Sequence, residues 1–260
     1  MNKLVLSFPR LALVLRNDLR IFVRPILLAS AVLLGLMLIL YMVQVQDVLE
    51  HGTIPPFFTE WFGVVLFLSG FLFSSLAFFE LSHKGKAMAF LLTPASQLEK
   101  WLSRWLLTSL GFTFYLWLVF GVISLICGGV SQLVFGAQLS PFEWGGENVW
   151  LLLRLYLVFQ SLFMAGSVFF GKLAFLKTPI SLAIVGVALL LVLYVTIKLV
   201  MWDISKPGWS FEPDGAFQNS AAYKDFMEYY AVGALSFLFW WGMAPFFWVV
   251  SYVRLTEKEV

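Results

Sequence analysis

The chain has 260 residues, of which 61% are hydrophobic, 18% are aromatic and only 12% are charged, and its formal net charge is +2. A soluble domain is about half apolar and about a quarter charged, and a soluble core of this size could not hide so much apolar surface, because burial is limited by the ratio of surface to volume. The composition therefore excludes a soluble globular enzyme, a disulfide scaffold, a disordered chain and a fibre, and it leaves a multi-pass membrane protein.

Residues 1–25 predict a cytoplasmic amphipathic helix before the first membrane span. Between residues 9 and 24, apolar side chains recur on one helical face and arginines on the other. A basic amphipathic helix of this kind lies in the membrane interface, where apolar burial and anionic lipid hold it. The alternative is that these arginines only fix the orientation of the chain.

Six windows of about 20 apolar residues follow, and each is long enough to cross about 30 Å of hydrocarbon. They occupy residues 26–45, 61–79, 105–127, 149–170, 180–201 and 231–253. The apolar residues form continuous blocks rather than a strict alternation, which favours helices over a β-barrel. The predicted fold is all-α, with a six-helix transmembrane domain over residues 26–253 and a short tail over residues 254–260.

Residues that favour helix starts, stops and kinks accompany these windows. Proline prefers the first turn of a helix, a Ser-x-x-Glu pair forms a capping box, glycine tolerates the left-handed C-terminal cap, and proline within a helix kinks it. These signals are Pro25 and Pro179 at two starts, with Thr178 as an N-cap, Ser96 and Glu99 before the third window, Gly128 and Gly129 at its end, and Pro245 inside the sixth.

Lysine and arginine are unevenly divided between the two sides of this arrangement. Thirteen of the 17 fall in the N-terminal segment, the even-numbered connections and the tail, and four fall on the opposite side. Cytoplasmic loops carry the excess of these residues. Both termini and the even-numbered connections are therefore predicted to be cytoplasmic.

The chain offers little for catalysis. Its two histidines, His51 and His83, lie in connections, and it contains no G-x-S-x-G, H-E-x-x-H or P-loop motif. We therefore expect no enzyme activity, no catalytic residue, no cofactor and no metal in this chain. The single cysteine, Cys127, cannot form a disulfide within one chain.

Two polar residues lie in the fourth window. Arg154 and Gln160 are candidates for lining a translocation path, because polar groups inside a membrane often mark one. In the structural alternative, Arg154 extends to the outer interface and Gln160 forms a hydrogen bond to another helix.

The connection between the second and third windows, residues 80–104, contains the most distinctive pattern. It reads ELSHKGKAMAFLLTPASQLEKWLSR and mixes charges with apolar residues that a solvated turn does not need. Pro94 disfavours helix at the preceding residue, and Ser96 then begins a new helix. We expect a short helix that projects from the membrane and docks on a partner through exposed apolar groups. The alternative is a segment that lies on the lipid surface.

The stretch LLTPASQLEKWLSRWLLTS (91–109) resembles the cytoplasmic loop of ABC-transporter permeases of the type-2 exporter class. Those loops have a leucine-rich run, then proline, a small residue, serine, a hydrophobic residue and glutamate before the third span. The matching residues are Leu91, Leu92, Pro94, Ala95, Ser96, Leu98 and Glu99. The class often has Gly-Lys after the glutamate, whereas this chain has Lys100 without the glycine. The tail, residues 252–260, looks like that of some bacterial members.

The resemblance implies a permease subunit of an ATP-driven exporter in the bacterial cytoplasmic (inner) membrane. Family permeases pair as homodimers or heterodimers and bind separate ATPase subunits, which hold the ATP and magnesium. Contact with the ATPase is made by the loop between the second and third spans. Carried over to this chain, the contact residues are His83, Lys84, Lys86, Met88, Phe90, Leu91, Leu92, Thr93 and Pro94.

Three other functions stay open at this point. The chain could be a self-contained channel or secondary transporter, which would move its cargo without ATP or a partner. It could be a membrane enzyme that acts on lipid, although no histidine lies at membrane depth. It could also be an anchor that recruits an ATPase for mechanical work without transport. No nucleic-acid-binding pattern is present.

Overall fold

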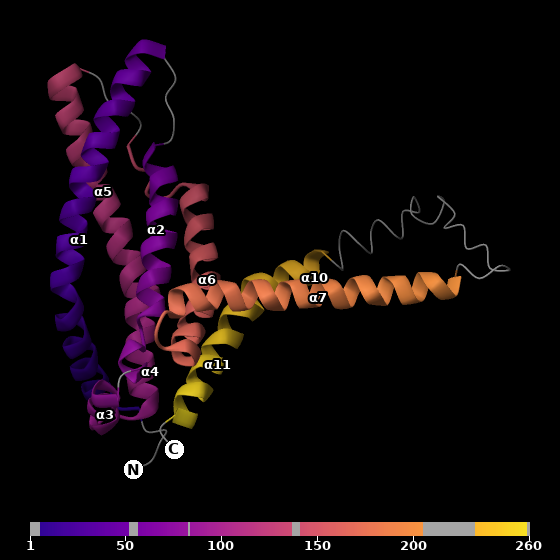
Figure 1. Ribbon diagram of the computed structural model, residues 1–260. Helices are drawn as coiled ribbons and strands as arrows, with labels where there is room; N and C mark the ends of the chain where they lie inside the picture. Colours follow the sequence, from indigo (N-terminus) through magenta and orange to yellow (C-terminus); the bar gives the residue numbers. More distant parts are fainter. Residues whose placement is uncertain (1–5, 52–56, 83, 137–140, 205–231, 259–260) are drawn as a thin grey trace.

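The computed structural model describes residues 6–51, 57–82, 84–136, 141–204 and 232–258, and these residues form helices joined by short connections, with no strand among them (Figure 1). Five helical segments are long and apolar enough to cross a membrane. They are α1 (Phe8–His51), α2 (Phe57–Ser75), α4 (Gln97–Leu106) continued through a π turn into α5 (Phe112–Phe135), α6 (Glu147–Phe170) and α7 (Ala174–Ile204). The all-α class is confirmed for the described residues, and the helices indicate a multi-pass membrane protein.

The predicted boundary at Pro25 is wrong, because α1 runs through this proline as one 44-residue helix. Tertiary contacts explain the continuity. Asp18, before the proline, is buried against α4, and Met37 and Tyr41, after it, are fully buried against α2 and α5. Proline is tolerated inside apolar helices when neighbouring groups satisfy the freed backbone, so packing along both halves outweighs the local signal.

Two other predicted boundaries are also wrong. The helix α5 passes through Gly128 and Gly129 and ends only at Gly136, which adopts the left-handed conformation with φ 66°. The helix α7 begins at Ala174, so Pro179 lies inside it. Thr178 is not an N-cap; it is buried, and a Cβ on Gly166 of α6 would lie 1.9 Å from its hydroxyl oxygen.

The core lies between α1, α2, α5 and α6, and aromatic rings fill most of it. Phe62 of α2 meets Phe120 of α5 edge to face, with ring centroids 5.3 Å apart, and Phe142 lies against both rings. Gly70 lets α2 approach α6, because an added Cβ would lie only 2.3 Å from the ring of Tyr156. Close packing of this kind fixes the relative positions of the four helices.

A π turn, η2 (Leu107–Gly111), joins α4 to α5 and anchors both to α6. The wider turn leaves the carbonyl of Thr108 available, and the Tyr156 hydroxyl donates to it at 2.8 Å. The side chain of Thr108 accepts a second hydrogen bond, from the Gln160 amide at 2.9 Å. A polar network thus holds the centre of the bundle.

The sixth predicted window does not form one regular helix. Its described part is α10 (Val232–Phe237), a second π turn η4 (Leu238–Gly242) and α11 (Met243–Lys258). The sequence predicts a kink at Pro245, because proline lacks a backbone N–H and crowds the preceding turn of a helix. The irregularity found in the structure is the π turn, which ends shortly before this proline.

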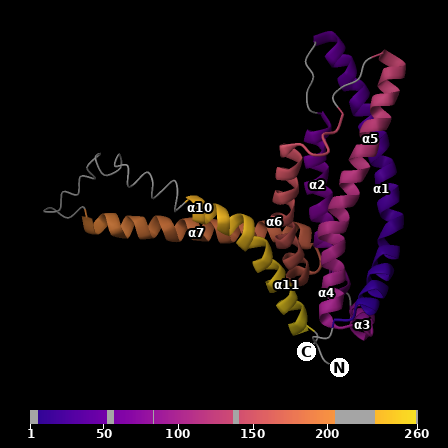
Figure 2. The ribbon, with the colours of Figure 1, turned by 180° about the vertical axis from the view of Figure 1, so that it is seen from behind.

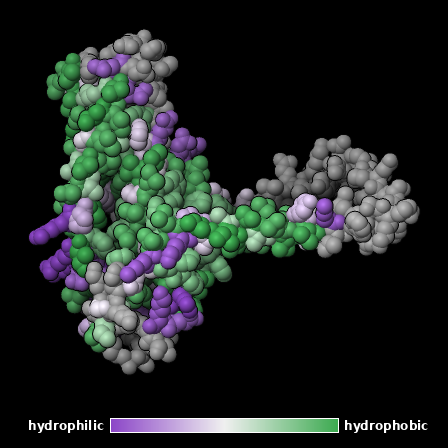
Figure 3. Space-filling view, in the orientation of Figure 1, coloured by the Kyte–Doolittle hydropathy of each residue, from purple (hydrophilic) through white to green (hydrophobic). Residues whose placement is uncertain are grey.

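The helix α7 runs away from the bundle, roughly across the direction of α1, α2 and α5 (Figures 1 and 2). Apolar residues cover this arm and the middle of the bundle, whereas hydrophilic residues gather near the ends of the bundle (Figure 3).

The first turn of α1 and the last turns of α11 lie at the same end of the bundle, beside α4. The Ser7 backbone N–H donates to Glu99 at 2.7 Å, and the Trp101 indole donates to Ser251 at 2.8 Å. Lys258 donates to the carbonyl of Val168 at the end of α6. Burial, and then the neighbouring Arg254 cation, lower the pKa of Lys258.

Candidate functional site

A compact projection closes this end of the bundle, and we call residues 79–96 the knob. It consists of the 3₁₀ turn η1 (Phe79–Ser82), the nine-residue helix α3 (Lys84–Leu92) and the turn that leads into α4. The expected break after Leu92 is confirmed. The capping box is confirmed as well, because the Ser96 hydroxyl accepts from the Glu99 N–H at 3.2 Å and the Glu99 carboxylate accepts from the Ser96 N–H at 2.8 Å.

The knob presents apolar side chains outward. Met88 is 68% exposed and Leu92 is 81% exposed, and Thr93 and Pro94 beside them are also exposed. Phe90 points the other way: its ring meets Phe78 edge to face, with centroids 6.4 Å apart. Among the described side chains of α3, Phe90 therefore packs the knob against the bundle, whereas Met88 and Leu92 are exposed.

The remaining predicted contact residues divide into two groups. Lys84, Lys86 and Leu91 lie in α3. His83 lies outside the described residues.

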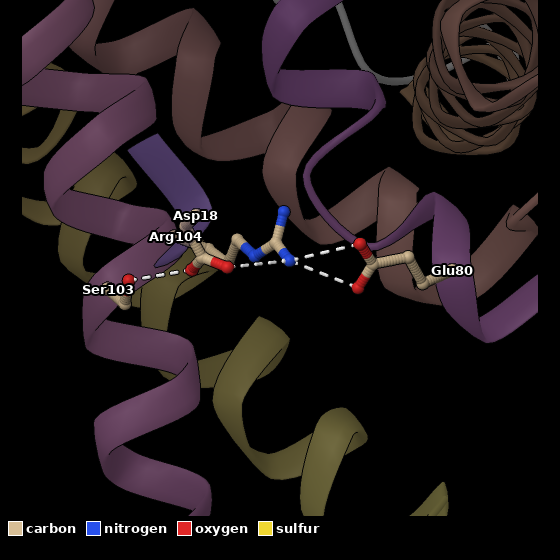
Figure 4. A network of polar contacts seen from close by, with 4 residues as sticks. All are labelled: Asp18, Glu80, Ser103 and Arg104. Carbon is tan, nitrogen blue, oxygen red and sulfur yellow. Dashed lines mark hydrogen bonds and ion pairs between the residues drawn. The ribbon is translucent and has the colours of Figure 1, made fainter. Parts of the chain in front are cut away.

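An ion network ties the base of the knob to two long helices (Figure 4). Arg104 of α4 contacts Glu80 of η1 at 3.0 and 3.2 Å and Asp18 of α1 at 3.1 Å. The Ser103 hydroxyl donates to the other oxygen of Asp18 at 2.8 Å. A buried guanidinium is tolerated only when it is paired and hydrogen-bonded, and here two carboxylates from different elements pair with it.

A second cluster holds the start of α1. Glu99 is fully buried, and besides capping α4 it accepts from the Ser7 N–H and lies 3.5 Å from Arg10. The same carboxylate thus bonds to the beginnings of both α1 and α4.

A cavity of about 730 Å³ opens between α1, the knob and α4. Leu13, Phe22 and Phe79 contribute to an apolar wall. The charged residues that line it are Arg10, Asp18, Glu80, Lys100 and Arg104. Phe90, Thr93 and Pro94, which the sequence singled out, line it as well. Its volume and mixed lining are those of a small-molecule or headgroup site.

The two polar residues of the fourth window lie elsewhere and apart from each other. Arg154 is exposed on α6. Gln160 is fully buried, and its amide donates to Thr108 and accepts from the Trp248 indole at 3.2 Å. Neither residue lines the cavity at the knob. The bonds of Gln160 join α6 to η2 and α11, as the packing alternative expects.

Sequence reasoning missed Asp18 and Glu80 as members of the network. Asp18 carried a usable signal, since it is the one acidic residue in the arginine-rich segment of residues 9–24. Within the described residues, no group of three or more histidine, cysteine, aspartate or glutamate side chains could hold a metal ion. The arrangement suits binding and the transmission of force.

Comparisons of the chain with protein-family models, with curated proteins and with solved structures found no match. Its function is therefore argued from its own residues and geometry.

Proposed function

We propose that the chain is the membrane-spanning permease subunit of an ATP-driven exporter of the type-2 ABC class, and that a separate ATPase subunit docks on the knob. The observation that carries the proposal is the apolar surface of α3, where Met88 and Leu92 are mostly exposed. Apolar groups on a polar end of a membrane protein favour a protein partner.

The base of the knob supports the same function. Arg104, Asp18 and Glu80 join α4, α1 and η1, and Glu99 joins the first turns of α1 and α4. Packed helices move as units. ATP-driven closure of an ATPase pair against α3 would therefore move α1 and α4 together, and α4 continues into α5.

The proposal includes six spans with both termini in the cytoplasm. The fifth span is α7, which lies across the bundle in this structure, so the proposal requires α7 to swing into line with the other spans in the membrane. The sixth span is α10, η4 and α11 taken together, and the excess of lysine and arginine favours a cytoplasmic location for the knob. The shared location of the start of α1 and the end of α11 supports an even number of crossings. The membrane is proposed to be the bacterial cytoplasmic membrane, and the permease is proposed to pair with a second permease.

Copurification tests the docking surface. The tagged full-length chain is extracted from its native membrane in mild detergent, and a copurifying P-loop protein is identified by mass spectrometry and by ATP hydrolysis. We expect Leu92→Asp to reduce the recovered ATPase at least about tenfold, because burying an unpaired charge in an apolar contact is costly. Phe90 is unsuitable for this test because it packs against Phe78 and holds the knob to the bundle.

The matched control is Leu133→Asp. Leu133 is 89% exposed near the other end of α5, so the same change there is expected to leave ATPase recovery at the wild-type level. Equal recovery with Leu92→Asp and wild type would contradict the docking site. Transport by the purified chain alone, without ATP, would contradict the permease function itself and favour a channel or secondary transporter.

A further inference from the structure

Among the side chains that the structure describes, those of α7 are buried only near its start. Ala174 and Thr178 are 2% and 4% exposed, whereas Val185 and Leu189 are 55% and 64% exposed. The closest contact is with α6, because a Cβ on Gly166 would lie 1.9 Å from the Thr178 hydroxyl oxygen. The missing side chain thus lets the two helices touch at this point, and α7 then leaves the bundle (Figure 1).

The length of α7 is that of an upright membrane span. Lys177 and Lys198 are exposed, and the 20 residues between them are uncharged. At 1.5 Å per residue the two lysines are about 32 Å apart along the helix, close to the thickness of the hydrocarbon. A lysine extends its ammonium group to the nearest interface. The two lysines therefore reach opposite interfaces only when α7 stands along the membrane normal.

The contact between Gly166 and Thr178 determines how α6 and α7 would align. Eighteen residues make five complete turns of an α-helix and extend about 27 Å. Asn148 lies 18 residues before Gly166, and Thr196 lies 18 residues after Thr178, so each shares the face of its contact residue. In an antiparallel pair that keeps the contact, Asn148 and Thr196 would therefore meet about 27 Å away from it. Both side chains are exposed in this structure.

The shared faces between these two ends are apolar. They carry Leu162, Phe159, Leu155 and Leu152 in α6 and Leu182, Val185, Leu189 and Val192 in α7. The cations of the two helices point elsewhere, at 100° per residue. Arg154 lies about a third of a turn from the Gly166 face, and Lys198 lies on roughly the opposite side of α7 from Thr178. An antiparallel pairing on these faces therefore buries no charge.

The first turn of α7 already lies where α2 and α6 meet. Phe163 of α6 stacks on Phe71 of α2, with ring centroids 4.4 Å apart, and Phe175 of α7 lies 6.1 Å from Phe163. Farther toward the outer ends of the same two helices, Phe159 and Val64 are 37% and 48% exposed. A helix aligned with α6 would cover these apolar side chains.

The connection between α6 and α7 suits such a pair. It has only the three residues 171–173, and short connections of this length join antiparallel helices. Gly171 and Leu173 have φ values of 57° and 59°, and the left-handed conformation is costly for leucine. Hinges are a few loop residues that absorb changes in φ and ψ, so this connection is the place where α7 can change direction.

We propose that in the membrane α7 turns about its contact with Gly166 and packs antiparallel to α6, with the Asn148 amide bonded to the Thr196 hydroxyl oxygen at the outer end. The Thr196 hydroxyl already donates to the Val192 carbonyl at 2.8 Å, which leaves its oxygen as an acceptor. Close approach at small residues and hydrogen bonds between helices drive association in lipid. The inference rests on the proposed fifth span and requires neither an ATPase nor transport.

Cysteine cross-linking in native membranes tests the pairing. In a full-length chain with Cys127→Ser, we expect Asn148→Cys and Thr196→Cys to form an intramolecular disulfide in most chains on mild oxidation, because a disulfide requires Cβ atoms about 4 Å apart. The matched control combines Asn148→Cys with Tyr194→Cys. Tyr194 lies at nearly the same depth on the far face of α7, so its yield should be at least about tenfold lower.

Equal yields in the two pairs, or no disulfide in either, would overturn the pairing. A disulfide between two chains would overturn it as well, because the α7 helix of a second copy would then cover α6. Labelling separates the inference from the topology on which it rests: Lys198→Cys should react with a membrane-impermeant maleimide in intact cells. Labelling without the disulfide would refute the hairpin and keep the fifth span, whereas no labelling would refute both.

Discussion

At the scale of single residues, the close approach of α2 and α6 depends on one missing side chain. An alanine at Gly70 would place a Cβ 2.3 Å from Cε2 of Tyr156, and the Tyr156 hydroxyl is buried and bonded to the Thr108 carbonyl. We expect Gly70→Ala to shift the ring, strain the packing and weaken this bond, at a cost of about 2 kcal/mol or more. The thermal midpoint in detergent would fall by roughly 4–8 °C.

The control for this change is Gly35→Ala in α1. No atom lies within 4 Å of the position that its Cβ would take, and alanine is the better helix former. The midpoint of Gly35→Ala should therefore equal or exceed that of the wild type. A midpoint unchanged in Gly70→Ala would show that α2 and α6 do not pack as closely as the structure has them.

Residue-scale patterns were predictable where partners are close in the sequence. The Ser96–Glu99 capping box and the break at Pro94 depend on groups three or fewer residues apart, and both are confirmed. The Asp18–Arg104–Glu80 network joins residues 24 and 86 positions apart, so local patterns could single out Asp18 among the arginines but could not identify its partners. The Tyr156–Thr108 bond was hidden for the same reason, and also because it requires a π turn.

At the scale of elements, the start of α4 depends on its cap. We expect Ser96→Ala to lower the free energy of unfolding by about 1 kcal/mol, because the Glu99 N–H loses its acceptor. Ser96→Asn should retain most of the stability, because asparagine caps about as well as serine. Thermal unfolding in detergent measures both, with about 2–4 °C expected for the alanine variant.

A larger effect is expected for Glu99→Leu at the same helix start. That change deprives the backbone N–H groups of both Ser7 and Ser96 of their acceptor and leaves Arg10 without its carboxylate. If Glu99→Leu proved no more destabilising than Ser96→Ala, the carboxylate would not be holding the start of α1.

Helix boundaries were less predictable than helix existence. Pro25, Pro179 and the pair Gly128–Gly129 all lie inside helices, although each residue type usually marks an end. Proline and glycine preferences amount to a few kcal/mol at most, and residues buried on both sides of the break, such as Asp18 and Tyr41 around Pro25, oppose them. The helix that contains Pro245 is irregular, as predicted, but the irregularity is a π turn that precedes the proline. The sequence could not specify that form.

At the scale of the whole molecule, a lipid environment explains both the high apolar content of the chain and the exposure of apolar helices in the fold. Only 6% of the most apolar stretch of α7 is buried, compared with 61% for α6. In water such an exposed helix would be an aggregation hazard, whereas in lipid its outer surface is as apolar as its surroundings. The high apolar fraction therefore belongs to the surface of the molecule as well as to its core.

The orientation of the bundle can be tested with a matched pair of exposed leucines. Leu92 is 81% exposed on the knob and Leu133 is 89% exposed near the end of α5, and the 38-residue segment Gln97–Val134 separates them, about 57 Å at 1.5 Å per residue. In a chain whose only cysteine has been removed by Cys127→Ser, we expect a membrane-impermeant maleimide to label Leu133→Cys in intact cells. Leu92→Cys should react only after the membrane is permeabilised. Because the two side chains are similarly exposed on the protein, a difference in labelling reports the side of the membrane. Reaction of Leu92→Cys in intact cells would place the knob out of reach of any cytoplasmic ATPase.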